Sequence, residues 1–265
     1  MQEFLIQLVK AVIIQIGGLF GIFFAFGFVL SKLQEWTQKN YFRSVGWKGI
    51  LWTAWIGTPL HEYSHAFFAK LFRHKIINMA LFKPNYQTGE LGYVHHSYNQ
   101  KSFYQSVGNF FIGSAPMISG SLFLVLLLKF ILPNGNQVFA PLTGDYSFLG
   151  MLKGVIESIS ILFSWQNLTS GWFWLFLYIS FCIASHMAPS KPDRKGIWYG
   201  FILIVIVLII LNILFLLIKI DITNYVLTLS KWLSILIAVF TYATIISFTH
   251  LLISKIIFWP IKKLR

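Results

Sequence analysis

Long apolar runs separated by shorter polar stretches make up most of this chain. A helix needs about 20 apolar residues to cross the roughly 30 Å hydrocarbon core of a bilayer. The pattern predicts six membrane-spanning helices, at about residues 8–30, 49–71, 107–131, 170–188, 198–219 and 230–258. The second and fourth runs are the ones that carry polar groups. We therefore expect an all-α polytopic membrane protein that forms one domain over residues 1–265.

The two long stretches between the predicted spans follow other patterns. In residues 72–106, short β-favouring runs flank turn signals, PN at 84–85 and TGE at 88–90. Such runs around turn residues predict a β-hairpin or small sheet. The stretch of about 132–169 contains MLKGVIESISILF, whose mixed face suits a helix lying in the membrane interface.

Composition supports the membrane class and changes how the charge is interpreted. Hydrophobic residues make up 57% of the chain and charged residues 11%, against about 25% charged in soluble domains. The 21 Lys and Arg exceed the 8 Asp and Glu, which in a membrane protein indicates the positive-inside rule and not a nucleic-acid partner. With six spans, 13 of those 21 cations share one side with both termini. We expect a multi-pass protein of a bacterial plasma membrane, with both termini in the cytoplasm.

The second apolar run contains HEYSH, residues 61–65, in the middle of a predicted span. On a helix, His61 and His65 lie one turn apart and project from one face, as two ligands of one Zn²⁺ must. Glu62 lies beside them, where a carboxylate can accept a proton from the attacking water. The alternative is a chance match in a core helix, but an ionisable group near the bilayer centre costs about 2.5–3.5 kcal/mol. The membrane context favours a metal site.

A catalytic zinc has three protein ligands and one open position. The end of the fourth predicted span, CIASHMAPSKPDRKG at 182–196, offers Cys182, His186 and Asp193 as the third ligand. In the expected topology this segment ends at the same depth as the two histidines of HEYSH. The residues alone leave the choice among the three open. For Cys182, the only cysteine of the chain, a small buried thiol is the simpler interpretation.

Both segments resemble motifs of the site-2 protease family of intramembrane zinc proteases. HEYSHAFFAKLFRHKI is similar to the H-E-x-x-H-x-x-x-A-K stretch of that family, and SHMAPSKPDRKG is similar to its N-x-x-P-x-x-x-L-D-G type motif. The resemblance covers about residues 50–197 and implies a site-2-protease-like catalytic core there. It makes Asp193 the third zinc ligand. His186 falls close to the position where the family has an asparagine that steadies the oxyanion, so the resemblance makes His186 either this donor or a ligand in place of Asp193. The spacing from Pro189 to Asp193 is one residue shorter than in the family form.

The resemblance therefore implies a zinc metalloendopeptidase with metal ligands His61, His65 and Asp193 and catalytic residues Glu62 and His186. Its substrates would be membrane-embedded or membrane-proximal proteins or peptides, cut near the cytoplasmic face of the lipid bilayer. A zinc-stabilised scaffold or chaperone of the same fold, without catalysis, is the alternative. A transporter is disfavoured, because no span shows the paired half-helices of that class.

Two other features of the sequence bear on these roles. Asp193 has Arg194 and Lys195 beside it, so an exposed ion pair is the ordinary alternative to metal ligation. His95 and His96 fall on a predicted strand, where neighbouring side chains point to opposite faces, so only one of them is expected to face the site.

Overall fold

The computed structural model describes residues 2–144, 146–232 and 234–263. It is mostly helical and has one two-stranded sheet within the described residues, which confirms the predicted all-α class and the small sheet. In chain order the elements are α1 (Gln2–Ile16), the π-helical η1 (Gly17–Gly21), α2 (Ile22–Val45), α3 (Trp47–Leu71), β1 (Lys75–Ala80), β2 (Tyr93–Ser97), α4 (Phe103–Ile131), α5 (Gly135–Phe139), the 3₁₀ turn η2 (Ala140–Thr143), α6 (Phe148–Leu162), α7 (Trp165–Leu168), α8 (Gly171–Ala184), α9 (Lys191–Leu217), α10 (Thr223–Trp232) and α11 (Ser234–Lys263).

The first three elements form one continuous helix of 44 residues, Gln2–Val45. It ends at Gly46, which has a φ of 74° and whose N–H donates to the carbonyl oxygen of Phe42 at 2.9 Å. A residue with positive φ directly after the last turn is a common way to end a helix, and glycine adopts it at the lowest cost. α3 begins at Trp47 and packs back against α2.

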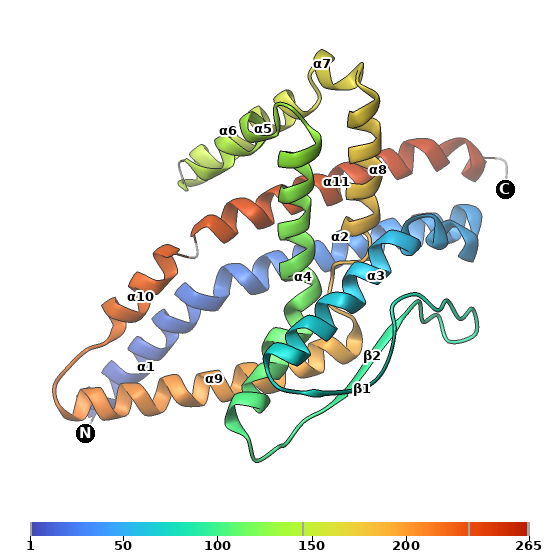
Figure 1. Ribbon diagram of the computed structural model, residues 1–265. Helices are drawn as coiled ribbons and strands as arrows, with labels where there is room; N and C mark the ends of the chain where they lie inside the picture. The colour runs from blue at the N-terminus through green and yellow to red at the C-terminus, as the bar shows by residue number, and fades with distance from the viewer. Residues whose placement is uncertain (1, 145, 233, 264–265) are drawn as a thin grey trace.

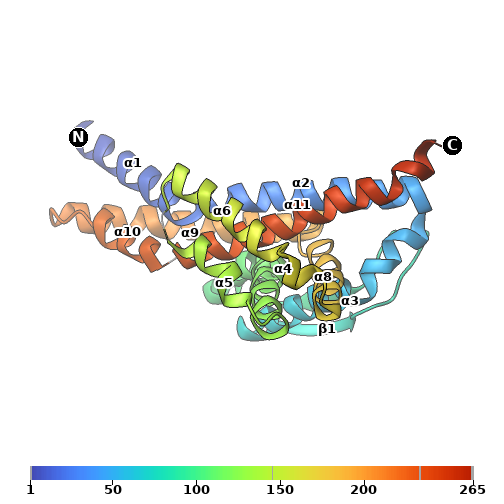
Figure 2. The same ribbon diagram turned by 90° about the horizontal axis from the view of Figure 1, so that it is seen from above.

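The long helices and the shorter ones run in different directions. α2 and α11 lie side by side and run the same way in Figure 1, and Figure 2 shows them side by side again. α4 and α8 cross these helices at a steep angle, so that Figure 2 shows both nearly end-on. The core lies at this crossing, and its largest fully buried side chains include Tyr242 and Phe240 of α11, Phe173 and Phe176 of α8, Leu30 of α2 and Met117 of α4.

The sheet pairs β1 with β2 in antiparallel orientation, inside the stretch 72–106 where a hairpin was predicted. The register shifts between Ile76, which pairs with His96, and Asn78, which pairs with His95. The extra residue makes a β-bulge, and a bulge twists the strand locally and re-aims neighbouring side chains. The bulge therefore lies opposite the two histidines of β2.

Four helices of the described residues are long and apolar enough to cross a membrane. They are Gln2–Val45, Phe103–Ile131, Lys191–Leu217 and Ile235–Trp259. They contain most of the predicted spans at 8–30, 107–131, 198–219 and 230–258. This supports the membrane class, while the cytoplasmic position of both termini stays a prediction.

The other two predicted spans are helical but do not meet this criterion, so the structure supports four such helices and not six. α3 contains His61, Glu62 and His65, and these polar residues lower its mean hydropathy. α8 has 14 residues, which at 1.5 Å per residue gives about 21 Å, less than the 30 Å of hydrocarbon. The interfacial helix expected in 132–169 corresponds in position to α6.

Candidate metal centre

His61 and His65 lie on successive turns of α3, with their Nε2 atoms 3.1 Å apart. Asp193, in the first turn of α9, completes the cluster: its Oδ1 lies 3.3 Å from His65 Nε2, and its Oδ2 lies 3.7 Å from His61 Nε2. Among the described residues, these three form a group whose possible ligand atoms all lie within 4.8 Å of one another. The structure thus brings together the two histidines and the aspartate singled out in the sequence.

The other ring nitrogen of each histidine faces a backbone carbonyl. His61 Nδ1 lies 2.5 Å from the carbonyl oxygen of His186, and His65 Nδ1 lies 2.8 Å from that of Ile112. A carbonyl oxygen only accepts, so each Nδ1 must carry a proton and donate it. Both Nε2 atoms are then bare acceptors in the neutral rings. A hydrogen bond that fixes the tautomer in this way is typical of metal-ligating histidines.

Three acceptor groups therefore point at one another. Two lone pairs and a carboxylate repel at separations of 3.1–3.7 Å unless a cation stands between them. A single proton satisfies one pair of these atoms, whereas a metal ion satisfies all three. Tetrahedral zinc with bonds of about 2.0–2.1 Å places neighbouring ligand atoms roughly 3.3 Å apart, close to the observed separations. The residues present fit a metal ion.

Asp193 is held by the N-terminus of its own helix. The N–H of Ser190 donates to Asp193 Oδ2 at 2.7 Å, and the N–H of Asp193 donates to Ser190 Oγ at 3.4 Å, which together make a capping box. The ion pairs of Asp193 within the described chain are with the two histidines, not with Arg194 or Lys195, and 14% of its side chain is exposed. The exposed-pair alternative therefore does not describe this residue.

Two glycines allow the backbone to approach this closely. A Cβ at Gly57 of α3 would lie 2.1 Å from the carbonyl oxygen of Cys182 and 2.8 Å from His186 Nδ1. A Cβ at Gly113 of α4 would lie 2.5 Å from the carbonyl oxygen of Asp193. Any side chain at either position would push the backbone away. The first glycine lets the end of α8 reach α3, and the second lets the start of α9 reach the site.

The segment between α8 and α9 is held by two glutamines of α2. Gln38 Nε2 donates to the carbonyl oxygen of Ser185 at 2.9 Å, and the N–H of Ala188 donates to Gln34 Oε1 at 2.8 Å. Buried backbone groups outside a helix need such partners. These contacts fix the segment whose carbonyl, at His186, holds His61. Sequence reasoning did not find the glutamines, although two amides one turn apart beside apolar runs were a visible signal.

The ring of His186 is buried and contacts a backbone carbonyl. Its Nδ1 lies 3.2 Å from the carbonyl oxygen of Cys182 and donates to it, while Nε2 has no hydrogen-bond partner among the described residues. In this tautomer Nε2 has no proton to donate, so the oxyanion role of His186 stays a prediction that requires a different protonation state. The Cys182 thiol is buried, and neither Cys182 nor His186 belongs to the group of candidate ligands.

A cavity of about 590 Å³ opens beside the cluster, between α2, α3, β2, α4 and the start of α9. Glu62 lines it and is itself buried. His95 and His96 both line it, but His96 is half-buried and His95 is exposed, in line with the alternation predicted for this strand.

Two histidines of the sheet region, His74 and His96, are held neutral by their surroundings. Burial, helped by the charges of His74 and His65 and opposed by Asp193, lowers the pKa of His96 to about 4. Burial also lowers the pKa of His74, against the hydrogen bond to the Gln105 carbonyl. Both rings are therefore neutral at pH 7.

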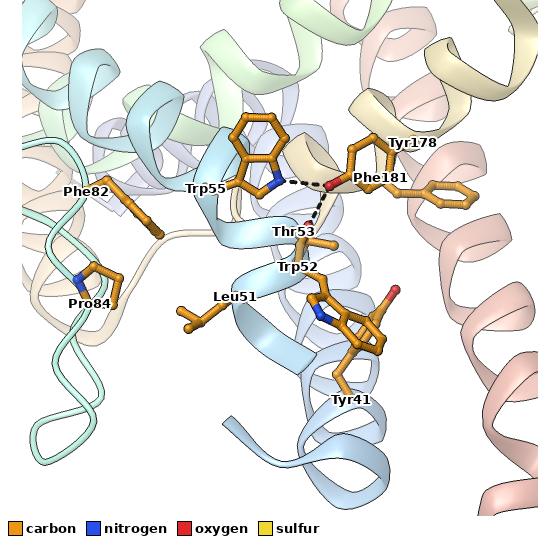
Figure 3. A pocket seen from close by; sticks show the side chains of 9 residues that line it. All are labelled: Tyr41, Leu51, Trp52, Thr53, Trp55, Phe82, Pro84, Tyr178 and Phe181. Atoms are coloured by element: carbon orange, nitrogen blue, oxygen red, sulfur yellow. Dashed lines mark hydrogen bonds between the residues drawn. The ribbon is translucent and has the colours of Figure 1, made fainter. Parts of the chain in front are cut away.

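A second hollow, of about 530 Å³, lies beside the N-terminal half of α3 (Figure 3). It is lined by Tyr41, Leu51, Trp52, Thr53, Trp55, Phe82, Pro84, Tyr178 and Phe181. Trp55 Nε1 donates to the Tyr178 hydroxyl at 2.8 Å, and that hydroxyl donates to the carbonyl oxygen of Trp52 at 2.8 Å. The described residues that line it include no histidine, cysteine or carboxylate. Candidate metal ligands therefore line the first cavity and not this one.

Fold and site together define a mostly helical protein with four helices that could cross a membrane and a group of two histidines and an aspartate that could hold a metal ion. No protein-family model, curated protein or solved structure matches this chain.

Proposed function

We propose that this chain is an intramembrane zinc metalloendopeptidase of the site-2 protease type. The observation that supports it is the convergence of His61 Nε2, His65 Nε2 and the Asp193 carboxylate beside a cavity that Glu62 also lines. In the described part of the chain, no fourth histidine, cysteine or carboxylate joins this group. Three ligands and an open position distinguish a catalytic zinc from a structural one.

The residues of this cavity suit peptide hydrolysis. Zinc held by the three ligands would act as a Lewis acid towards the scissile carbonyl. Glu62 takes a proton from the attacking water, whose oxygen bonds to the carbonyl carbon, and passes that proton to the leaving nitrogen as the C–N bond breaks. The products are a carboxylate and an amine. The carbonyl oxygens of His186 and Ile112 keep both histidine rings oriented throughout.

A membrane-embedded substrate explains why such a cavity would lie among apolar helices. The peptide groups of a spanning helix are hydrogen-bonded to one another and shielded from water, so cleavage needs a polar cavity and a locally unwound substrate. The cavity of about 590 Å³ is lined by polar groups from α2, α3 and β2. We propose a multi-pass protein of a bacterial plasma membrane, with both termini in the cytoplasm. It would cut membrane-embedded or membrane-proximal proteins or peptides near the cytoplasmic face of the membrane.

The test is cleavage of a reporter transmembrane peptide by the purified, zinc-loaded protein beside a Glu62→Gln variant. Glutamine keeps the size and shape of glutamate but cannot accept the proton, so cleavage should fall by about 10²–10⁴-fold. Zinc content should not change. Equal rates in the two proteins would rule out Glu62 as the base. A wild-type protein that binds zinc and the peptide but cuts nothing would support the scaffold alternative instead.

A further inference from the structure

A second pair of imidazoles lies beside the metal cavity. His74, between α3 and β1, is buried, and its Nδ1 lies 2.9 Å from Nδ1 of His96 on β2. His74 Nε2 lies 2.8 Å from the carbonyl oxygen of Gln105. The ring of Tyr98 stacks on His74, with centroids 4.8 Å apart and an interplanar angle of 16°. Three contacts therefore fix the His74 ring.

The direction of the hydrogen bonds in this pair follows from the carbonyl at its end. The Gln105 oxygen can only accept, so His74 Nε2 carries a proton and donates it. In the neutral ring, His74 Nδ1 is then an acceptor, and the proton between the rings belongs to His96 Nδ1. His96 Nε2 is left as a bare acceptor in a ring that lines the metal cavity.

His96 lies near the candidate ligands but is not one of them. It lines the same cavity as Glu62, and the charges of His65 and Asp193 act on it. It does not belong to the group of ligand atoms within 4.8 Å of one another. Its bare nitrogen is therefore available to something that enters the cavity and carries a donor.

We propose that His96 Nε2 accepts a hydrogen bond from a backbone N–H of the peptide substrate, and that His74 is the positioning residue that keeps this nitrogen unprotonated. This inference rests on the proposed peptidase function. An unwound peptide brings both carbonyl acceptors and N–H donors into the cavity, and a buried N–H without an acceptor weakens binding. Zinc would serve the scissile carbonyl and Glu62 the attacking water, which leaves the N–H for His96.

The first measurement reads the ring tautomers directly and needs no cleavage. Ring ¹⁵N NMR of the purified wild-type protein should show the Nε2–H tautomer for His74 and the Nδ1–H tautomer for His96. His74→Gln should leave His96 as a mixture of tautomers, whereas the control His95→Asn should not, because His95 stacks on Tyr93 and not on this pair. A proton on His96 Nε2 in the wild-type protein would overturn the inference.

The second measurement locates the donor on the substrate. His96→Phe keeps a ring but removes the acceptor, so it should slow cleavage of an all-amide peptide by about 10–100-fold with zinc content unchanged. A series of peptides, each with one amide replaced by an ester that lacks the N–H, should then locate the donor. At one position the ester should slow cleavage by the wild type by the same factor as His96→Phe does, and it should not slow His96→Phe any further. The control His95→Phe should stay within about threefold of wild type.

The outcomes separate this inference from the proposed function. If His96→Phe cuts the all-amide peptide as fast as the wild type, or stays slower than the wild type by the same factor on every ester peptide, the substrate contact is wrong. The peptidase assignment then still stands. If the wild type cuts none of the peptides, the peptidase assignment fails and the contact with it. The tautomer measurement then still judges whether His96 presents an acceptor.

Discussion

Two of the polar clusters among the apolar helices of the described chain are built in opposite ways. In one, Gln15 of α1 donates to Asn212 of α9 at 3.0 Å, and Asn212 donates back to Gln15 at 2.7 Å. The other consists of His61, His65 and Asp193. In the amide pair each donor meets an acceptor, whereas in the metal cluster the facing atoms are all acceptors.

The difference teaches how to interpret a polar group in an apolar helix. Amide pairs between helices hold the helices together and need nothing else, because their donors and acceptors match. A cluster of acceptors whose outer donors are already bonded to carbonyls is incomplete without a cation. Balance between donors and acceptors, more than polarity alone, separates a structural contact from a binding site.

The largest expected effect is on the amount of bound metal, and its absence would break this comparison. The purified protein should hold about one zinc per chain, and His61→Ala or His65→Ala should lose most of it, because two ligands remain from three. Metal analysis of the purified proteins measures this. The matched control is Asn212→Leu in the amide pair, which should keep its zinc. Full zinc occupancy in both histidine variants would show that the acceptor cluster is not the metal site.

The histidine pair could be predicted because its geometry is local. A spacing of four residues on a helix places two rings on one face whatever the tertiary fold. Asp193 was one of three candidates from the residues alone and was chosen only through the family resemblance, since it lies more than a hundred residues away and its position depends on how α9 packs. The backbone carbonyls of His186 and Ile112 could not be predicted, because every residue has one and only packing selects which is used.

The fold was predicted in class but not in the number of spans. Hydropathy located all the long helices, yet α3 and α8 were counted as spans although one carries the site residues and the other is short. The His74–His96 pair was missed for another reason. His74 precedes β1 and His96 lies on β2, so their contact depends on how the two strands pair, which no local pattern shows.

A smaller effect sharpens the role of Asp193, which is both a candidate ligand and part of a capping box. Asp193→Asn keeps an oxygen for the Ser190 N–H but removes the carboxylate charge, so zinc affinity should fall by about 10–100-fold or more with little change in stability. Ser190→Ala is the control, because it removes the other half of the box and should cost about 1 kcal/mol of stability while zinc affinity is kept. Competition with a chelator and thermal unfolding measure the two quantities. The reverse pattern would make Asp193 a helix cap only.

The smallest effect tests the amide pair itself. Gln15→Leu leaves Asn212 with an unmatched donor and acceptor, and Asn212→Leu does the same to Gln15, so each should lower the free energy of unfolding in detergent by about 1–2 kcal/mol. The double variant removes both amides together, so neither is left facing an apolar side chain. The groups that lose a partner are then the outer ones, Thr223, which Gln15 contacts, and the Leu208 carbonyl, to which Asn212 donates. The double variant should therefore cost less than the sum of the two single changes, by about 0.6 kcal/mol or more. Strictly additive losses would mean that the two amides do not depend on each other, and the contrast with the metal cluster would then lose its reference point.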